Sequence, residues 1–162
     1  MRFRRGKLNI LRFLVNCWPL LFFPLTHNLS LPPTTNKFTI TIQAENYSNM
    51  FGVVPENTSD MGGGRNVGYI NTGDWMSYPG VAIPTTGAYR VEYRVAGFGG
   101  SLQFERAGGT PVYGGLSIPW TGGWQNWATI SHTVNLSAGT QFFGIKATAG
   151  GWNLNWFRIT KV

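Results

Sequence analysis

The sequence predicts an all-β domain over residues 38–162, with the architecture of a β-sandwich of the jelly-roll type. Apolar residues alternate with polar ones at a period of two, as in strands with one buried face. Turns rich in glycine, proline and asparagine separate the alternating stretches at intervals of roughly 8–12 residues. No stretch has the apolar periodicity of an amphipathic helix. A domain of this length can bury one core without disulfides.

The alternation is clearest in two segments. In FTITIQAEN (38–46), the side chains of Phe38, Ile40 and Ile42 face one way and the polar side chains face the other. In AYRVEYRV (88–95), four apolar side chains alternate with arginines and a glutamate. We expect further strands near 75–83, 101–106, 127–136, 140–147 and 153–160.

The N-terminal part of the chain has a different composition. Residues 1–25 combine a basic start, MRFRRGK, with an apolar stretch, as in a secretory signal peptide. Polar residues and two prolines interrupt the apolar stretch, and no A-x-A cleavage site follows, so the segment is either such a signal or a non-native leader. The first alternative predicts a secreted protein that is not in a membrane in its mature form. Residues 26–37 are rich in Pro, Thr and Asn and are expected to form a linker.

The charge of the folded part argues against nucleic acid as a partner. The sequence pI is about 10.0, but five of the thirteen basic residues lie within the first twelve positions. From Lys37 onward, eight Lys and Arg face six Asp and Glu, so the domain is nearly neutral. Proteins that bind nucleic acid usually present a basic face to the phosphates. The single cysteine, Cys17, precedes the domain, so no disulfide is expected within it.

Aromatic residues beside glycine mark the candidate binding residues. Five of the seven tryptophans lie between Trp120 and Trp156, several of them in glycine-rich segments such as TGGWQNW (121–127). A flat ring beside amides and carboxylates suits a sugar, which has one apolar face and many hydroxyls. We interpret Trp124 as a binding ring rather than a tryptophan folded back on the sandwich edge. Tyr69 is either a second binding ring or an ordinary edge aromatic.

Two further pairs of polar residues allow two readings each. Asn153 and Asn155 share a strand face, where their amides match vicinal hydroxyls or cap a turn. Gln43 and Glu45 also share a face. They supply either part of the oxygen shell of a calcium ion or an ordinary solvated strand face.

The sequence shows no catalytic machinery. Hydrolysis of a glycoside usually needs two carboxyl groups about 5–9.5 Å apart. The six acidic residues form no recognisable pair, and His132 has the parity of core residues on its strand. Neither a phosphate-binding loop nor a nucleophile elbow is present. We therefore expect a protein that is not an enzyme.

Five segments together resemble carbohydrate-binding module family 6, in order and in spacing, across essentially all of residues 40–160. The segments are IQAEN (42–46), GGGRNVGYINTGDWMSY (62–78), GAYRVEYRVA (87–96), TGGWQNWATI (121–130) and GGWNLNWFRI (150–159). The resemblance implies a jelly-roll sandwich with a structural calcium and a sugar cleft among the loops at one end. Some members also use a second cleft on the concave sheet face, which the sequence does not locate.

The resemblance also implies roles for individual residues. Tyr69 and Trp124 match the two rings that sandwich a sugar, and Asn153 matches an asparagine that hydrogen-bonds it. Glu56 matches an acidic residue that helps to set specificity. The calcium ligands fall on Gln43, Glu45 and Asn155. Many relatives carry Asp at the position of Asn155, so calcium is expected to bind more weakly here.

The function implied by the resemblance is a non-catalytic, monomeric module that binds a polysaccharide for a tethered glycoside hydrolase. The segments look most like modules of agarases, which makes agarose or a related galactan the first expected ligand and β-glucan or xylan the next. The alternatives are a small glycoside hydrolase and a structural or adhesive sandwich with no sugar ligand.

Overall fold

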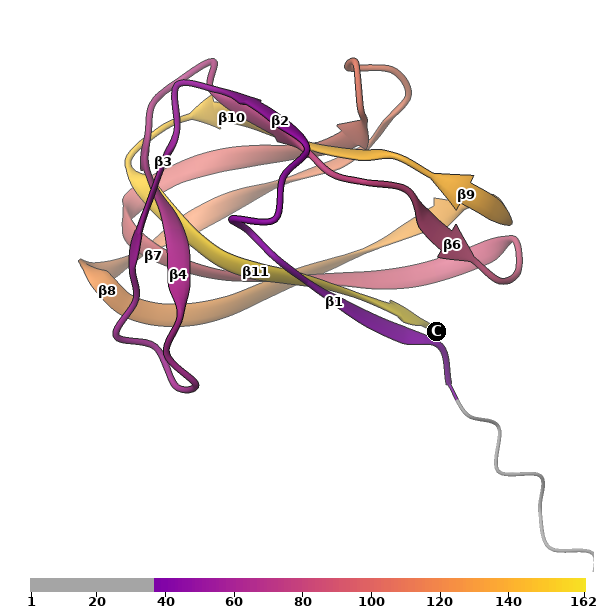
Figure 1. The fold of residues 1–162 in the computed structure, drawn as a ribbon, viewed down its shortest axis with the longest axis horizontal. Coiled ribbons are helices and arrows are strands. Elements are labelled where there is room, and N and C mark those ends of the chain that lie inside the picture. The colour runs from indigo at the N-terminus through magenta and orange to yellow at the C-terminus, as the bar shows by residue number, and fades with distance from the viewer. Residues whose placement is uncertain (1–36) are drawn as a thin grey trace, which may run out of the picture. The chain divides into compact units, whose positions relative to one another are not determined.

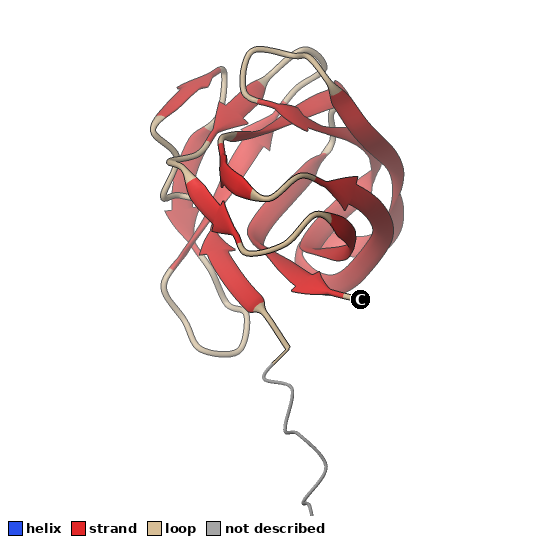
Figure 2. Cartoon of the chain, turned by 90° about the vertical axis from the view of Figure 1, so that its right-hand side faces the viewer, coloured by secondary structure: helices blue, strands red, loops and turns tan. Residues whose placement is uncertain are grey.

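The computed structural model describes residues 37–162. The predicted leader (1–25), and with it the prediction of secretion, lies outside the described residues, as does all but the last residue of the predicted linker. The described residues belong to one compact unit, and they form strands, turns and loops without any helix (Figure 2). This part of the chain therefore offers no helix long and apolar enough to cross a membrane.

Eleven strands make up the domain (Figure 1). In chain order they are β1 (Thr39–Gln43), β2 (Asn49–Phe51), β3 (Val54–Asn57), β4 (Arg65–Ile70), β5 (Trp75–Ser77), β6 (Val81–Ile83), β7 (Gly87–Arg106), β8 (Val112–Leu136), β9 (Gly139–Gln141), β10 (Phe143–Ala149) and β11 (Trp152–Lys161).

The long hairpin of β7 and β8 organises the sheets. On its second edge, β7 pairs first with β11, over residues 89–97, and then with β10, over residues 101–106. The strand order is β2-β5-β10-β7-β11-β4-β3, with β1 on β11 and β8 on β7, while β6 and β9 form a separate pair. Because β7 changes partner at its centre, it joins the β2-β5-β10 group to the β11-β4-β3 group. The predicted all-β sandwich is confirmed.

Glycines allow the bend in β7. Gly97 and Gly100 have φ values of 150° and 133°, which side-chain-bearing residues rarely adopt. A Cβ on Gly97 would collide with the carbonyl oxygen of Gly151, and a Cβ on Gly100 would lie 2.6 Å from that of Gly150. The strand therefore passes directly against the turn before β11, and only glycine fits there.

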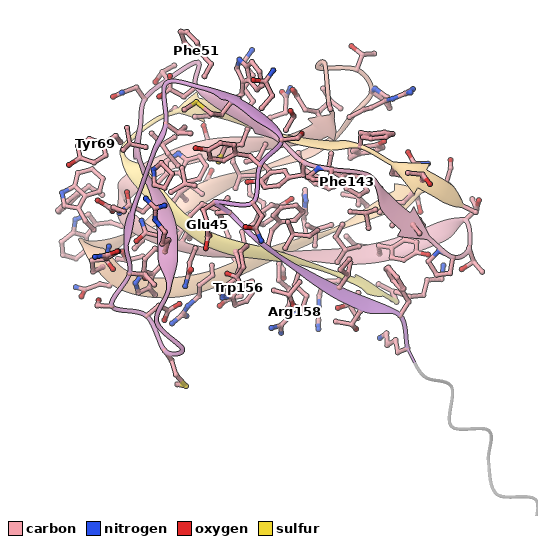
Figure 3. All side chains as sticks on the ribbon, in the orientation of Figure 1. Glu45, Phe51, Tyr69, Phe143, Trp156 and Arg158 are labelled. Atoms are coloured by element: carbon pink, nitrogen blue, oxygen red, sulfur yellow. The ribbon has the colours of Figure 1, made fainter. Side chains whose placement is uncertain are left out.

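The core lies between the two groups of strands and confirms the predicted alternation. Tyr89, Val91, Tyr93 and Val95 are fully buried, and the apolar face of β1 packs against the same cluster. Phe143 stacks against another core ring with centroids 4.9 Å apart, and it lies inside the domain in Figure 3. Because side chains alternate between the two faces of a strand, burial of the apolar face leaves the other side chains of each long strand on the face away from the core.

Several predicted strand bounds were wrong. The segment 75–83 is two short strands, β5 and β6, because Pro79 and Gly80 interrupt it. The segments 101–106 and 127–136 are the ends of longer strands, β7 and β8. The segment TGGWQNW belongs to β8 rather than to a separate loop, but it is irregular there. Val95 pairs with Ala128 and Gly97 with Gly123, so residues 124–127 bulge from β8 opposite a single residue of β7.

Candidate functional site

A cleft of about 440 Å³ opens at one end of the domain. The four residues that the sequence singles out for sugar binding all line it: Glu56 from β3, Tyr69 from β4, Trp124 from the bulge of β8 and Asn153 from β11. Its remaining lining residues are Ile70, Asn71, Gln125 and Gly151. Figure 3 shows Tyr69 at the left-hand end of the domain, pointing away from the core.

Strand pairing explains why residues far apart in the sequence meet here. β4 lies between β3 and β11, and Glu56 stands opposite Asn66 in the β3–β4 pair. Asn153 stands opposite Ala96 of β7, which is the residue that the bulge of β8 faces. The cleft therefore forms where the bulge interrupts the pairing of β8, next to the end of β4 and the start of β11.

A hydrogen-bonded carboxylate forms the floor of the cleft. Oε1 of Glu56 accepts hydrogen bonds from the side-chain amides of Asn153 at 2.7 Å, Asn66 at 2.9 Å and Gln125 at 3.4 Å. Gly68 leaves room for this arrangement, because a Cβ there would lie 2.7 Å from Oε1. Oε2 of Glu56 accepts no hydrogen bond from the described residues and remains available to a ligand.

Asn153 is held more tightly than its sequence context indicates. The residue is only 2% exposed, and its Nδ2 donates both to Glu56 and, at 2.9 Å, to the backbone carbonyl of Trp124. Both partners are acceptors, which fixes the orientation of the amide. The donors of Asn153 are thus used inside the protein, and Oδ1 is the atom that it can offer to a ligand.

Two exposed rings form the apolar part of the cleft. Tyr69 is 66% exposed and Trp124 is 49% exposed. Phe98 packs edge-on against Trp124, with ring centroids 4.9 Å apart and planes at 76°. Among the described residues, Tyr69 is the only one other than glycine with a positive φ, which is 56°. Such a backbone costs about 1–2 kcal/mol and often marks a functional position.

Gln125 is a cleft residue that the sequence did not identify. Its Nε2 donates to Glu56 and, at 3.1 Å, to Asn66, while its Oε1 accepts from the backbone N–H of Ser59 at 2.8 Å. Gln125 therefore ties the floor of the cleft to the loop before β4. The only indication in the sequence was that Gln125 follows Trp124. Asn126 also lies just after this tryptophan, so that indication does not separate the two amides.

The three residues predicted to bind calcium do not all offer free ligand atoms to one ion. Oε2 of Glu45 is buried and has no hydrogen-bond partner in the described part of the chain, which fits a carboxylate that binds a cation. Gln43 is exposed at the end of β1. Asn155 is buried and donates to Oδ2 of Asp60 at 2.8 Å. No group of three or more His, Cys, Asp or Glu side chains with the geometry of a metal site occurs within residues 37–162.

Asp60 already has a cationic partner. Arg94 donates to both oxygens of Asp60, at 2.7 and 2.9 Å. These bonds from Arg94 hold the pKa of the Asp60 carboxyl below its usual value, and the bond from Asn155 acts in the same direction, while burial opposes both. The loop that follows β3 is thereby anchored to β7.

Comparison with known proteins identifies the family. The model of the family described as "Carbohydrate binding module (family 6)" matches residues 43–161. The chain belongs to this family. A module from Cellvibrio mixtus lichenase 5A, solved in complex with cellotriose, is 61% identical, with a TM-score of 0.74 over 76% of this chain and 97% of that one. The C-terminal family 6 module of LamC, a marine laminarinase from Zobellia galactanivorans, is 53% identical, with a TM-score of 0.73 over 76% of this chain and all of that one.

One curated relative comes from an animal. The clotting factor G alpha subunit of Tachypleus tridentatus is 50% identical over 123 residues, which cover 75% of this chain and 18% of that protein. The module thus spans less than a fifth of the length of the curated relatives that it matches.

A second hollow, of about 270 Å³, lies on the sheet face of β5, β10 and β7. Trp75 and Lys146 pair across β5 and β10, and Glu105 pairs with Gly144, two residues before Lys146 on β10. These residues face away from the core. Gly144 leaves room for Glu105 to lie along the sheet, since a Cβ there would come within 3.2 Å of its side chain. This is a candidate for the second cleft of the family.

The other acidic residues of the module have structural partners. Asp74 accepts from the backbone N–H of Asn71 at 2.8 Å and so closes the turn after β4. Glu92 lies 3.7 Å from Arg90 on an open sheet face. Glu56 is the one acidic residue among those that line the first cleft. His132 packs at the core edge, where burial lowers its pKa.

Proposed function

We propose that the module binds a chain of β-linked glucose in the first cleft. The observation that supports this most is the pairing of two exposed rings, Tyr69 and Trp124, with a polar floor inside one cleft. An apolar sugar face packs on the rings, and the hydroxyls at its rim reach the floor.

The ligand acts mainly as a hydrogen-bond donor at the floor. Oε2 of Glu56 and Oδ1 of Asn153 are acceptors without a hydrogen-bond partner within residues 37–162, and sugar hydroxyls can donate to both. Two or three such bonds contribute about 0.5–1.5 kcal/mol each, together with the burial of one sugar face. After the cost of ordering, the binding free energy is roughly −8 to −4 kcal/mol, which corresponds to micromolar to millimolar dissociation constants.

The comparisons favour glucan over the agarose predicted from the sequence. The 61% identical module was solved with cellotriose, and the 53% identical module belongs to a laminarinase. Both names refer to β-linked glucose. Agarose stays a prediction, and it is the second candidate in the binding test below.

We also propose that the module performs no catalysis and directs an attached enzyme to its substrate. The family consists of binding modules, and the cleft presents a single carboxylate whose Oε1 is occupied by amide donors. A reducing-end assay on the chain with β-glucan, with a β-glucanase as positive control, should detect no product. Product release that is lost in Glu56→Gln would contradict this proposal.

Calcium is proposed as a structural ion bound through Glu45. Oε2 of Glu45 has no donor among the described residues. Burial raises the pKa of the Tyr78 hydroxyl, and the negative charge of Glu45 acts in the same direction. A cation at Glu45 would supply the missing charge without changing the binding cleft. Chelation should lower the melting temperature of the wild type and leave that of Glu45→Gln unchanged, because only a native-state ligand stabilises the fold. An unchanged wild type would contradict the proposal.

The second hollow is proposed as an additional glycan site. Trp75 supplies a half-buried ring, while Glu105 and Lys146 supply an acceptor and a donor. Lys146→Ala should weaken binding only at this site, so titration of wild type with a short glucan would show two sites and titration of the variant one. Two unaltered sites in the variant would refute this assignment.

Affinity gel electrophoresis of the full chain tests the main proposal. Gels containing mixed-linkage β-glucan, laminarin, xylan or agarose would be run with wild type, Trp124→Ala and Phe142→Ala. Phe142 is half exposed like Trp124 but lies outside the residues that line either site, so it is a matched control. We expect β-glucan to retard wild type and Phe142→Ala but not Trp124→Ala. Retardation by agarose alone would replace the glucan proposal, and equal retardation of all three proteins would refute the site.

A further inference from the structure

Three exposed aromatic side chains lie in a row that starts at the cleft, and we call them the aromatic strip: Trp124, Phe98 and Trp120. Phe98 packs edge-on against Trp124, and it stands opposite Trp120 in the β7–β8 pair. Their exposed fractions are 49%, 52% and 70%. A contiguous exposed apolar patch of this kind usually marks a binding surface.

An amide lies beside the far end of the strip. A Cβ placed on Gly122 would lie 3.4 Å from Nδ2 of Asn126 and 3.6 Å from the ring of Trp120. The ring edge of Trp120 and the amide of Asn126 therefore both lie close to Gly122. Asn126 is exposed, and its side chain makes no hydrogen bond with the described residues. An open ring beside an unused amide has the same chemistry as the first cleft.

We infer that Trp120 and Asn126 form an outer subsite, which binds a sugar residue of the same glucan chain beyond the residue held at Tyr69 and Trp124. The inference rests on the proposed function of the cleft. Continuity through Trp124 and Phe98 is the reason to assign both sites to one chain. The side chains of the strip and of Asn126 are uncharged, which suits a neutral polysaccharide.

The subsite makes affinity depend on ligand length. A glucan short enough to fill only the cleft has no contact with Trp120, whereas a longer one packs on its ring and hydrogen-bonds Asn126. A ring contact of this kind and one hydrogen bond correspond to about a three- to tenfold gain in affinity.

Isothermal titration calorimetry on the full chain with β-linked gluco-oligosaccharides of two to six residues tests the inference. The proteins are wild type, Trp120→Ala, Asn126→Ala, Trp124→Ala and the control Phe142→Ala. Because the side chain of Trp120 is largely exposed, its removal should not change the melting temperature, which is measured for each variant. We expect Trp120→Ala and Asn126→Ala to bind the hexasaccharide three- to tenfold more weakly and the shortest bound oligosaccharide as well as wild type. Trp124→Ala should lose affinity at every length.

Three results would overturn the inference. In the first, wild type binds short and long oligosaccharides equally well. In the second, Trp120→Ala binds the hexasaccharide like wild type while Trp124→Ala does not, which leaves the cleft proposal standing. In the third, loss of Trp120 weakens all lengths equally, which would place it in the cleft itself. Absence of binding by wild type at every length and linkage would instead refute the proposed function.

Discussion

Replacing Gly68 with alanine should disable the cleft through its floor. The φ of Gly68 lies outside the left-handed region, so the backbone accepts alanine, and in open space that change would stabilise the fold by about 0.4–1 kcal/mol. The added methyl, however, would lie 2.7 Å from Oε1 and 2.9 Å from Cδ of Glu56, and 3.1 Å from Oδ1 of Asn153. Since both side chains form the floor, neither can move without breaking their mutual hydrogen bond.

The cost follows from the bonds that the displaced carboxylate makes. Oε1 accepts three amide hydrogens, and a hydrogen bond to a charged group contributes about 1.5–3 kcal/mol. Loss of the bond from Asn153 leaves one of the two amide hydrogens of this buried side chain without an acceptor, and we expect a decrease in the free energy of unfolding of about 2–4 kcal/mol. We expect glucan affinity to fall at least tenfold as well, because Trp124 is held by the same amide.

A double-mutant cycle isolates the contact. Urea unfolding and calorimetric binding would be measured for wild type, Gly68→Ala, Glu56→Ala and the double variant. In the Glu56→Ala background the methyl meets only Oδ1 of Asn153, so Gly68→Ala should then cost less than about 1 kcal/mol. Equal destabilisation in both backgrounds would refute the reasoning. Gly115→Ala, on an exposed part of β8, adds a methyl 3.2 Å from the backbone carbonyl oxygen of Leu102 and so controls for a tight Cβ contact outside the cleft.

The remaining predictions concern the loops around the cleft. Tyr69→Gly should relieve the positive φ and raise the free energy of unfolding by about 1 kcal/mol while glucan affinity falls at least tenfold; a fall in both would mean that the ring supports the fold. Gln125→Glu should place a second carboxylate beside Glu56, so binding should weaken at neutral pH and recover towards about pH 4, where carboxylates protonate; a pH-independent loss would point to shape instead. Asp60→Asn should lower the free energy of unfolding by about 1–3 kcal/mol at neutral pH. Because the pKa of Asp60 is lowered in the folded state, its contribution is complete above the unfolded value of about 4 and is lost as the pH falls through the folded value. The two proteins should therefore become equally stable in stronger acid, and a constant difference would exclude the ion pair as the cause.

The sequence predicted those features that a local pattern encodes. Alternation in 88–95 required one buried face, and Tyr89 through Val95 show it. Glycine beside Trp124 favoured a ring that projects over one folded back on the sandwich edge, and Trp124 is half exposed on the bulge of β8. The family resemblance assigned Glu56 and Asn153 to the cleft, although 97 positions separate them, and no local pattern could have brought them together.

Other features depended on contacts that no pattern encodes. The glycines around Gly97 let β7 pass close to the turn before β11, a contact between distant segments that the sequence did not predict. Gln125 and Asn126 are adjacent amides after the same tryptophan, and the sequence alone does not show which one enters the cleft. The bulge decides it, because it turns Gln125 towards Glu56 and leaves Asn126 exposed beside Trp120.

Under the proposed function, the hydrogen bonds of the floor would let the cleft discriminate among sugars. The donors of Asn153 are already used by Glu56 and by the carbonyl of Trp124, so ligand binding does not have to order them. What remains at the floor is a pair of acceptors, Oε2 of Glu56 and Oδ1 of Asn153, in fixed positions. We therefore expect a sugar to be selected by where its hydroxyls can donate while its apolar face covers the rings. Because each acceptor is fixed by a bond to a residue of another strand, a change in any one of β3, β8 or β11 alters selectivity as well as affinity.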